Sequence, residues 1–212
     1  VVLICDANEA LAPELPGYTL TELIYRSSRS RVWRGLNAEK RPVIVKFSAD
    51  DYPSERQLAG MQRALRLGQL LQGDFVVLHL CLEVHGQQLA LVTEDYGAQS
   101  LDHRPKPLEL ATFLDIGGQI ARALAHLHSH GVAHKDIKPA NIVQNPQSGL
   151  VKLIDLEIAS QLSQETATTT DVPLIEGTLI YIAPEQTGRM NRSVDHRSDL
   201  YAMGATLYEL LT

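Results

Sequence analysis

Residues 134–141, with the sequence HKDIKPAN, bring together several side chains that could do chemistry. Asp136 and Asn141 lie on this stretch, which Pro139 predicts to be a loop. Asp155 follows after a segment patterned as strand, turn and strand, and a hairpin of that length can return Asp155 to the loop. Amide and carboxylate oxygens are hard ligands that suit Mg²⁺, so Asn141 and Asp155 are candidate metal ligands. Asp136 is then left to accept a proton or to orient a hydroxyl group.

Two lysines could serve the same site. Lys138 lies two residues after Asp136 and could offset phosphate charge. Lys46 follows the apolar residues of VIVKF (43–47), and an ammonium group that emerges from a buried strand needs an anion such as a nucleotide phosphate. The alternatives are a charged, solvated turn at 134–141 and a surface lysine at a strand end for Lys46.

The composition limits the classes of function. The chain has 212 residues, of which 44% are hydrophobic, and this is enough apolar material for a core in one domain or two small lobes. A net charge of −6 and a pI of about 5.7 argue against nucleic acid as a partner. Cys5 and Cys81 lie far apart in apolar settings, as buried thiols of a reduced protein do. No apolar run reaches the ~18 residues of a membrane span, so we expect a cytoplasmic protein without one.

Patterns of hydrophobicity divide the chain into two parts. The first part is patterned as five strands and one amphipathic helix, with strands at 18–25, 30–36, 42–47, 75–84 and 88–96 and the helix at 53–71. From residue 108 the period is helical, with long helices expected at 108–131 and 199–212. We expect an α+β fold with lobes at 18–95 and 102–212, joined by a hinge at 96–101 and preceded by an extension at 1–17.

Several motifs, in the correct order, resemble those of protein kinases. HKDIKPAN is similar to the catalytic loop H-R-D-x-K-P-x-N, with Lys135 in place of arginine, and IDLE (154–157) stands where kinases carry D-F-G. GTLIYIAPE (177–185) resembles the end of an activation segment, and the next helix carries Asp199, which in kinases ties back to the catalytic loop. VIVKF resembles the third strand with its phosphate-binding lysine.

The finer resemblance is to bacterial Hanks-type, or eukaryotic-like, serine/threonine protein kinase domains at the N-terminus of large proteins with ATPase, GAF and sensor histidine kinase modules. It implies a two-lobed protein-kinase-like fold, with a β-rich N-lobe and a helical C-lobe, that transfers the γ-phosphoryl group of ATP to a protein serine or threonine. It also implies ATP and Mg²⁺ as cofactors, a protein substrate, and further signalling modules as partners. Because the chain stops in the helix after A-P-E, we expect a fragment with an incomplete C-lobe.

The resemblance implies a role for each matching residue. Asp136 is the base, Asn141 and Asp155 hold Mg²⁺, and Lys46 binds the phosphates. Lys138 and Thr178 stand where serine/threonine-selective kinases carry them. The nucleotide would meet the first hairpin and the hinge at Ser27, Ser30, Val32, Glu94 and Tyr96.

Two of the motifs depart from the kinase pattern. The glycine-rich loop G-x-G-x-x-G-x-V reads YRSSRSRV (25–32) and has no glycine, which makes close backbone approach to phosphate harder. Leu156 and Glu157 replace the Phe and Gly of D-F-G. Leu156 keeps an apolar anchor, and Glu157 adds a carboxylate beside the metal position.

A third departure lies in the first helix. Kinases carry a glutamate there that pairs with the phosphate-binding lysine, but the equivalent position falls at Ala64 or Leu65, and Glu55 lies at the wrong end. We therefore expect Lys46 to be poorly anchored unless it finds phosphate or Asp155. Ala64→Glu or Leu65→Glu is then expected to tighten Mg·ATP binding.

These departures leave a second function open, a pseudokinase that binds ATP or serves as a scaffold for attached signalling modules. A small-molecule kinase of the aminoglycoside type shares the H-x-D-x-x-x-x-N logic but is not expected to carry GTLIYIAPE. His126, His128, His130 and His134 include pairs at i, i+4, a spacing that zinc ligands use. Thr168, Thr169 and Thr170 are either phosphorylation sites or part of a polar loop.

Overall fold

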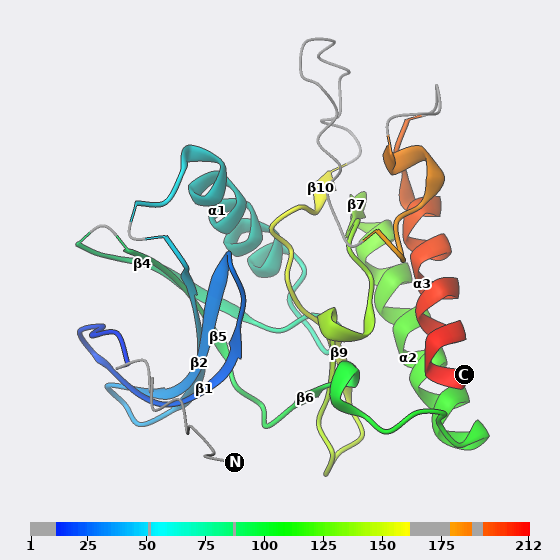
Figure 1. Ribbon diagram of the computed structural model, residues 1–212, viewed down its shortest axis with the longest axis horizontal. Coiled ribbons are helices and arrows are strands. Elements are labelled where there is room, and N and C mark those ends of the chain that lie inside the picture. Colours follow the sequence, from blue (N-terminus) through cyan, green and yellow to red (C-terminus); the bar gives the residue numbers. More distant parts are fainter. Residues whose placement is uncertain (1–11, 51, 87, 162–178, 188–192) are drawn as a thin grey trace, which may run out of the picture.

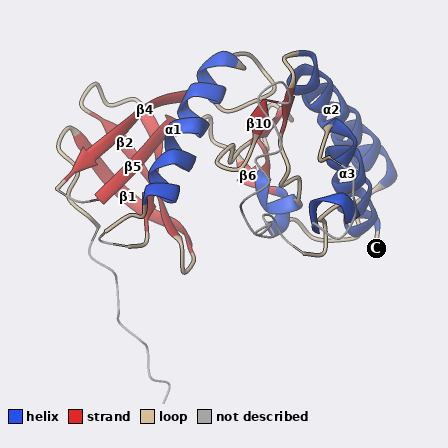
Figure 2. Ribbon diagram, turned by 90° about the horizontal axis from the view of Figure 1, so that it is seen from above, coloured by secondary structure: helices blue, strands red, loops and turns tan. Residues whose placement is uncertain are grey.

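The computed structural model describes residues 12–50, 52–86, 88–161, 179–187 and 193–212. A β-rich part and a helical part lie at opposite ends of the molecule, and helix α1 lies between the main sheet and the helical part (Figures 1 and 2). This arrangement is the expected α+β fold of two lobes. No helix in the described part of the chain is long and apolar enough to span a membrane.

The N-terminal part is built on a five-stranded antiparallel sheet with the strand order β1-β2-β3-β5-β4. Its strands are β1 (Tyr18–Arg26), β2 (Ser30–Asn37), β3 (Pro42–Ser48), β4 (His79–His85) and β5 (Gln88–Glu94). The register places Lys46 of the central strand β3 opposite Val32 on one side and Leu91 on the other. The predicted strand at 75–84 begins only at His79, because Val76 pairs instead with Leu153 of the second lobe and is buried there.

Helix α1 (Glu55–Leu70) is the one helix described in the N-terminal part. A capping box starts it, because the Ser54 side chain accepts the N–H of Gln57 and the Gln57 side chain accepts the N–H of Ser54. Its buried face includes Ala64 and Leu67, spaced three residues apart as a core-facing stripe requires. The helix thus covers the sheet with one apolar face, at nearly the bounds that the sequence predicts.

Short strands and two long helices form the C-terminal part. β6 (Gln99–Ser100), β8 (Ile142–Gln144) and β9 (Val151–Leu153) make a three-stranded sheet, and β7 (Val132–Ala133) pairs with β10 (Ser160–Gln161). Helix α2 (Leu110–Ser129) packs beside α3 (His196–Leu211), as Figure 1 shows. Short 3-10 helices occur at Leu101–His103, Pro139–Asn141 and Pro184–Thr187. Gln99 and Ser100 of the predicted hinge therefore belong to β6, and Leu101 begins a 3-10 helix.

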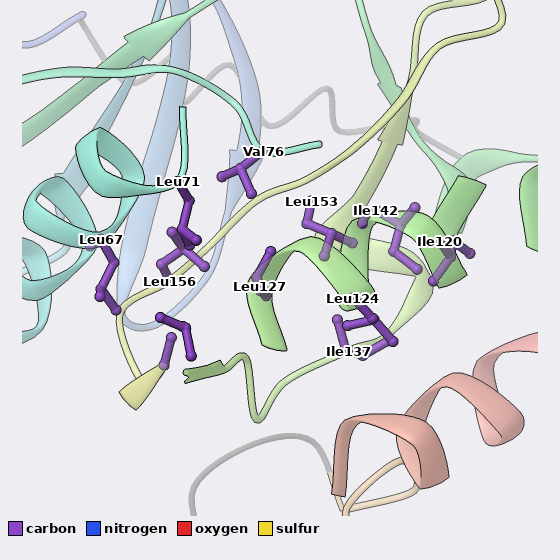
Figure 3. Close-up of a cluster of buried hydrophobic side chains, with 14 of the residues drawn as sticks. Leu67, Leu71, Val76, Ile120, Leu124, Leu127, Ile137, Ile142, Leu153 and Leu156 are labelled. Atoms are coloured by element: carbon purple, nitrogen blue, oxygen red, sulfur yellow. The ribbon is translucent and has the colours of Figure 1, made fainter. Parts of the chain in front are cut away.

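One hydrophobic cluster runs from α1 into the C-terminal part (Figure 3). Leu67 lies on its α1 side and Leu124 on its α2 side, and both are almost fully buried. Ile137 and Leu156, which belong to two polar loops, are completely buried in the same cluster. Each such side chain contributes about 1.5–3 kcal/mol by leaving water. Apolar residues inside the loops thus anchor the polar residues on either side of them.

Candidate active site

The loop at 134–141 is tied to α3 by a buried carboxylate. Asp199 has no exposed surface, and it accepts the backbone N–H of His134 at 2.9 Å and that of Lys135 at 2.7 Å. The Nε2 of His128 in α2 donates to the same carboxylate at 2.9 Å. Lys135 has a φ of +69°, in the left-handed region that non-glycine residues seldom adopt. The expected tie between Asp199 and the loop is confirmed, and it holds the backbone in this strained form.

His134 links the loop to the strand that leads to Asp155. Its Nε2 donates to the carbonyl of Ile154 at 3.0 Å, and its Nδ1 accepts the N–H of Asp136 at 3.3 Å. A carbonyl can only accept, so these two bonds require the Nε2–H tautomer of a fully buried ring. The imidazole is therefore a rigid brace between the backbone at Asp136 and that at Ile154.

Asp136, Lys138 and Asn141 are in direct contact. The Nζ of Lys138 donates to Oδ2 of Asp136 at 2.7 Å, and Nδ2 of Asn141 donates to that same oxygen and to the Asp136 carbonyl at 2.8 Å each. The amide is planar, so these bonds direct Oδ1 of Asn141 away from Asp136. Asp136 is thereby held in one orientation by two donors.

The hairpin of β8 and β9 returns the chain to Asn141, as the sequence predicts. Ile142 lies opposite Leu153, and the N–H of Ile154 donates to the Asn141 carbonyl at 3.0 Å. Asp155 follows directly, with a φ of +66°. Strained backbone at a non-glycine residue persists only where its surroundings enforce it, and such positions cluster at functional sites. The Asn141 amide and the Asp155 carboxylate are the oxygen donors that Mg²⁺ favours, so this pair fits the metal that the resemblance implies.

Lys46 is anchored by two carboxylates: its pairing with Asp155 is the alternative that the sequence left open, and its pairing with Glu157 was not expected. Its Nζ lies 3.0 Å from Oδ2 of Asp155 and 2.8 Å from Oε1 of Glu157. Burial lowers the pKa of Lys46, but the two anions outweigh it and raise that pKa above its usual value. Burial likewise raises the pKa of Asp155, and the ammonium of Lys46 outweighs it, so the pKa of Asp155 is lowered. Both groups are held in their charged forms.

Of the two positions proposed for a helix glutamate, Ala64 lies in the hydrophobic cluster and Leu65 packs against it. Ala64 is completely buried in the hydrophobic cluster. Gly60 of α1 lies against Glu157, since a Cβ added there would be 3.6 Å from Cβ of Glu157. The sequence reasoning noted Glu157 but missed its pairing with Lys46, because the partner comes from the loop after β9 and not from the helix.

The β1–β2 turn is closed by a serine side chain. Oγ of Ser27 accepts the N–H of Arg29 at 3.2 Å and that of Ser30 at 3.1 Å, which lets the turn form without glycine. Val32 then lies directly across from Lys46 in the sheet. The turn and the start of β2 therefore lie near the part of β3 that carries Lys46. The contact of Ser27, Ser30 and Val32 with a nucleotide remains a prediction.

Glu94, at the end of β5, and Tyr96, in the predicted hinge, join the two lobes through their side chains. Oε1 of Glu94 accepts a hydrogen bond from Nζ of Lys152 at 2.7 Å and one from the backbone N–H of Leu78 at 3.0 Å. The hydroxyl of Tyr96 donates to the carbonyl of Val143 at 3.1 Å, and Lys152 Nζ lies 4.9 Å from the centre of its ring. Burial raises the pKa of Tyr96 above its usual value. The expected nucleotide contacts of Glu94 and Tyr96 would therefore involve their backbone groups, and they remain predictions.

The segment after A-P-E contains a residue that sequence reasoning missed. Nε2 of Gln186 donates to the carbonyl of Lys135 at 3.0 Å, and its Oε1 accepts the N–H of Ala183 at 3.1 Å. Glu185 accepts the hydroxyl of Ser198 at 2.6 Å. Gln186 thus bridges this segment to the loop at 134–141, and its place directly after A-P-E is the only sequence signal that could have pointed to it. Thr178, and the threonines at 168–170, lie outside the described residues.

The histidines of α2 have structural contacts. The ring of His126 lies 5.0 Å from that of Phe75 and 4.6 Å from that of His130, centre to centre. His128 binds Asp199, as described above. In the part of the chain that the structure describes, no group of three His, Cys, Asp or Glu side chains could hold a metal ion. The structure therefore does not support the zinc alternative.

A two-lobed fold with a braced aspartate, an amide and carboxylate pair and an anchored lysine is the arrangement that the kinase-like motifs of the sequence predict. The comparisons with known proteins agree, because the model of the protein kinase domain matches residues 18–212. The chain belongs to the protein kinase domain family.

Several serine/threonine kinases are similar to the chain. It is 31% identical over 199 residues to serine/threonine-protein kinase 36 of Pongo abelii, with 91% of this chain and 14% of that protein covered. It is also 31% identical over 202 residues to the probable serine/threonine-protein kinase PknB of Lactococcus lactis subsp. lactis, with 92% and 31% covered. The DNA damage-responsive serine/threonine-protein kinase RqkA of Deinococcus radiodurans is 41% identical over 110 residues, with 52% and 16% covered. The chain thus spans less than a third of the length of each of these relatives.

Proposed function

We propose that the protein transfers the γ-phosphoryl group of ATP to a serine or threonine hydroxyl of a protein substrate. The observation that carries this proposal is the convergence of five side chains from three parts of the chain. Asp136 is oriented by Asn141 and Lys138, and Asp155 pairs with Lys46 beside that loop. Phosphoryl transfer depends mainly on positioning and charge, and this set supplies both.

Each residue has a defined role in the proposal. Asp136 accepts the proton of the attacking hydroxyl, and Lys138 keeps the carboxylate in place and offsets phosphate charge. Asn141 and Asp155 would hold Mg²⁺, which when bound neutralises charge on the phosphates. Lys46 would bind the phosphates from the β3 side. Thr178, with Lys138, would favour serine and threonine acceptors, by analogy with the kinases that the chain resembles.

The nucleotide would lie between the lobes. We assign residues 18–95 to the N-lobe and 102–212 to the C-lobe, with the hinge at 96–101 and an extension at 1–17. Backbone groups of Glu94 and Tyr96 would meet adenine, and the hairpin with Ser27, Ser30 and Val32 would cover the phosphates. The ion pair of Arg34 with Asp95 at 2.6 Å and that of Glu94 with Lys152 at 2.7 Å would hold the hinge in position for this contact.

The setting of the domain is also part of the proposal. A kinase of this type would work in the cytoplasm, where ATP and protein substrates are present. It would act on partner proteins and on signalling modules joined to it, such as those of the multidomain kinases that it resembles. Nucleic acid is not an expected partner of a chain with a net charge of −6.

A transfer assay with labelled ATP tests the proposal. The full chain is incubated with general protein substrates, with Mg²⁺ and with a chelator, and phosphoamino acids are identified in the products. We expect Mg²⁺-dependent label on serine or threonine. If the protein binds Mg·ATP but transfers no phosphate to itself or to any substrate, the proposal is wrong and a binding or scaffold role replaces it.

A further inference from the structure

Lys46 lies between two carboxylates that belong to the same loop. Asp155 is 3.0 Å from its Nζ and Glu157 is 2.8 Å from it, on two residues separated only by Leu156. The side chains of Lys46 and Glu157 are 20% and 26% exposed. Oε1 of Glu157 is shielded from solvent, and its contact with the Lys46 ammonium is an ion pair without hydrogen-bond geometry. A pair in such surroundings is screened less by water and salt than a pair on the surface.

Helix α1 has a glycine, and no acidic side chain, where it meets this loop. Among the residues of α1, Glu55 is the only acid, and it lies in the first turn. Gly60 faces Glu157 without a side chain, and a Cβ there would be 3.6 Å from both Cβ and the carbonyl oxygen of Glu157. One turn further along, Nη1 of Arg63 donates to the Glu157 carbonyl at 2.7 Å. On the helix side, the loop therefore meets Gly60, which has no side chain, and the guanidinium of Arg63. The carboxylate that pairs with Lys46 belongs to the loop.

We propose that Glu157 is the positioning residue that holds the Lys46 ammonium in place for the nucleotide phosphates, in place of an acid on α1. The inference rests on the function proposed above. A cation bound at Asp155 would compete with Lys46 for that carboxylate. Glu157 would then remain as the counterion of Lys46, which is partly buried and is costly to leave unpaired. Glu157 itself touches neither substrate nor phosphate in this arrangement.

The arrangement has a consequence for how the site is controlled. The metal ligand Asp155, the fully buried anchor Leu156 and the lysine anchor Glu157 are consecutive residues. A movement of this loop displaces all three together, whereas a movement of α1 reaches Lys46 through the bond from Arg63 to the Glu157 carbonyl. The orientation of Lys46 therefore depends directly on the loop after β9, and α1 affects it only indirectly, through its contact with that loop.

The first test compares Glu157→Gln with wild type in the full chain. Mg·ATP affinity is expected to fall about tenfold, the equivalent of 1.4 kcal/mol. Glu39→Gln is the matched control, because Glu39 forms an ion pair of 3.1 Å with Arg41 in which both side chains are more than half exposed. The control is expected to bind and transfer like wild type, since exposed pairs contribute little.

A stability measurement without nucleotide makes the test independent of activity. Glu157→Gln, Lys46→Met and the double variant are unfolded with urea. The two changes are expected to be non-additive, so that Glu157→Gln shifts the midpoint less in the Lys46→Met background than in wild type. Additive shifts, or wild-type Mg·ATP affinity in Glu157→Gln, would overturn the inference.

Relocating the carboxylate provides a third arm, which decides the matter if Glu157→Gln does not fold. The double variant Gly60→Glu/Glu157→Gly moves the acid to α1 and removes the side chain that it would meet. We expect it to bind Mg·ATP more tightly than Glu157→Gly alone, and equal affinities of the two variants would count against the inference. If wild type itself neither binds Mg·ATP nor transfers phosphate, the proposed function fails. If wild type transfers phosphate and the variants match it, only the role of Glu157 fails.

Discussion

The carboxylate of Asp199, in the first turn of α3, accepts the backbone N–H of Lys135 at 2.7 Å across 64 positions of sequence. The same side chain accepts from His134 and His128 and has no exposed surface. One buried carboxylate thus satisfies two backbone donors of the loop at 134–141 and joins that loop to both long helices. Hydrogen bonds to a charged acceptor are among the stronger ones in proteins.

Asp199→Asn is expected to lower the free energy of unfolding by about 2–3 kcal/mol, because an amide nitrogen would face a donor and the charge would be lost. Urea unfolding of the variant and of wild type measures the difference. The exposed change Asp74→Asn serves as the control and should cost little. A loss below about 0.5 kcal/mol for Asp199→Asn, the range of ordinary surface changes, would contradict this role.

Asp136→Asn should abolish phosphate transfer, with a loss of at least about 100-fold, while ATP binding changes little. The reason is that the proposed base and the proposed metal ligands are different residues, although Asn141 orients Asp136. Transfer rate and nucleotide affinity are measured on the same preparation. Full activity in the variant would show that the catalytic loop is wrongly assigned.

Gly68→Ala is expected to destabilise the protein by about 1–3 kcal/mol through overpacking. Its new Cβ would lie 2.0 Å from Nδ1 of His79, a buried ring that also bonds the carbonyl of Val77. Gly204→Ala in α3 is the matched control, since nothing lies within 4 Å of the added Cβ, and it should gain up to about 1 kcal/mol of helix propensity. Equal effects of the two changes would show that the contact of Gly68 with His79 is wrong.

Ala64→Glu, which the sequence alone favoured as a gain in Mg·ATP binding, is now expected to cost about 3–5 kcal/mol of stability. The position is completely buried among apolar side chains, so the carboxylate would have no counterion. Gln62→Glu on the exposed face of the same helix is the control. Tighter Mg·ATP binding by a stable Ala64→Glu protein would restore the original expectation.

Asp195 should make the stability of α3 depend on pH. It caps the helix by accepting the N–H of Arg197 at 2.8 Å, and the Arg197 guanidinium lowers the pKa of Asp195 to about 2. Because the folded pKa lies below the unfolded value of about 3.9, the contribution is present above pH 4 and is lost as the pH falls to about 2. Asp195→Asn keeps a good cap without the charge. The free energy of unfolding of wild type should therefore exceed that of Asp195→Asn by about 0.3–1 kcal/mol at neutral pH, and the difference should disappear in acid.

Much of the fold could be predicted from local patterns. The alternation of apolar residues predicted β1, β2, β3 and β5 nearly at their bounds, and the helical period predicted α1 and α2 within two residues at either end. The start of α3 was missed by three residues, because Asp195 caps the helix ahead of its apolar stripe. Val76 was assigned to a strand because it is apolar, yet it pairs with Leu153 of the other lobe.

The sequence by itself determined the chemical content of the site. Asp136, Asn141 and Asp155 are recognisable by type and spacing, and a short hairpin is enough to bring Asp155 back beside Asn141. Contacts of this kind join residues that are close in the sequence, so the geometry of the hairpin between them is enough to form them.

The tertiary structure alone decided what holds Lys46. Lys46 and Glu157 are 111 positions apart, and their pairing depends on which α1 residue faces the loop after β9. Helical periodicity shows that Gly60 and Ala64 lie on one buried face, but it does not say which of them meets the core and which meets the loop. Packing of Leu67 and Leu156 in the shared cluster settles the position of α1. A pairing fixed by packing between distant elements leaves no local signal in the sequence.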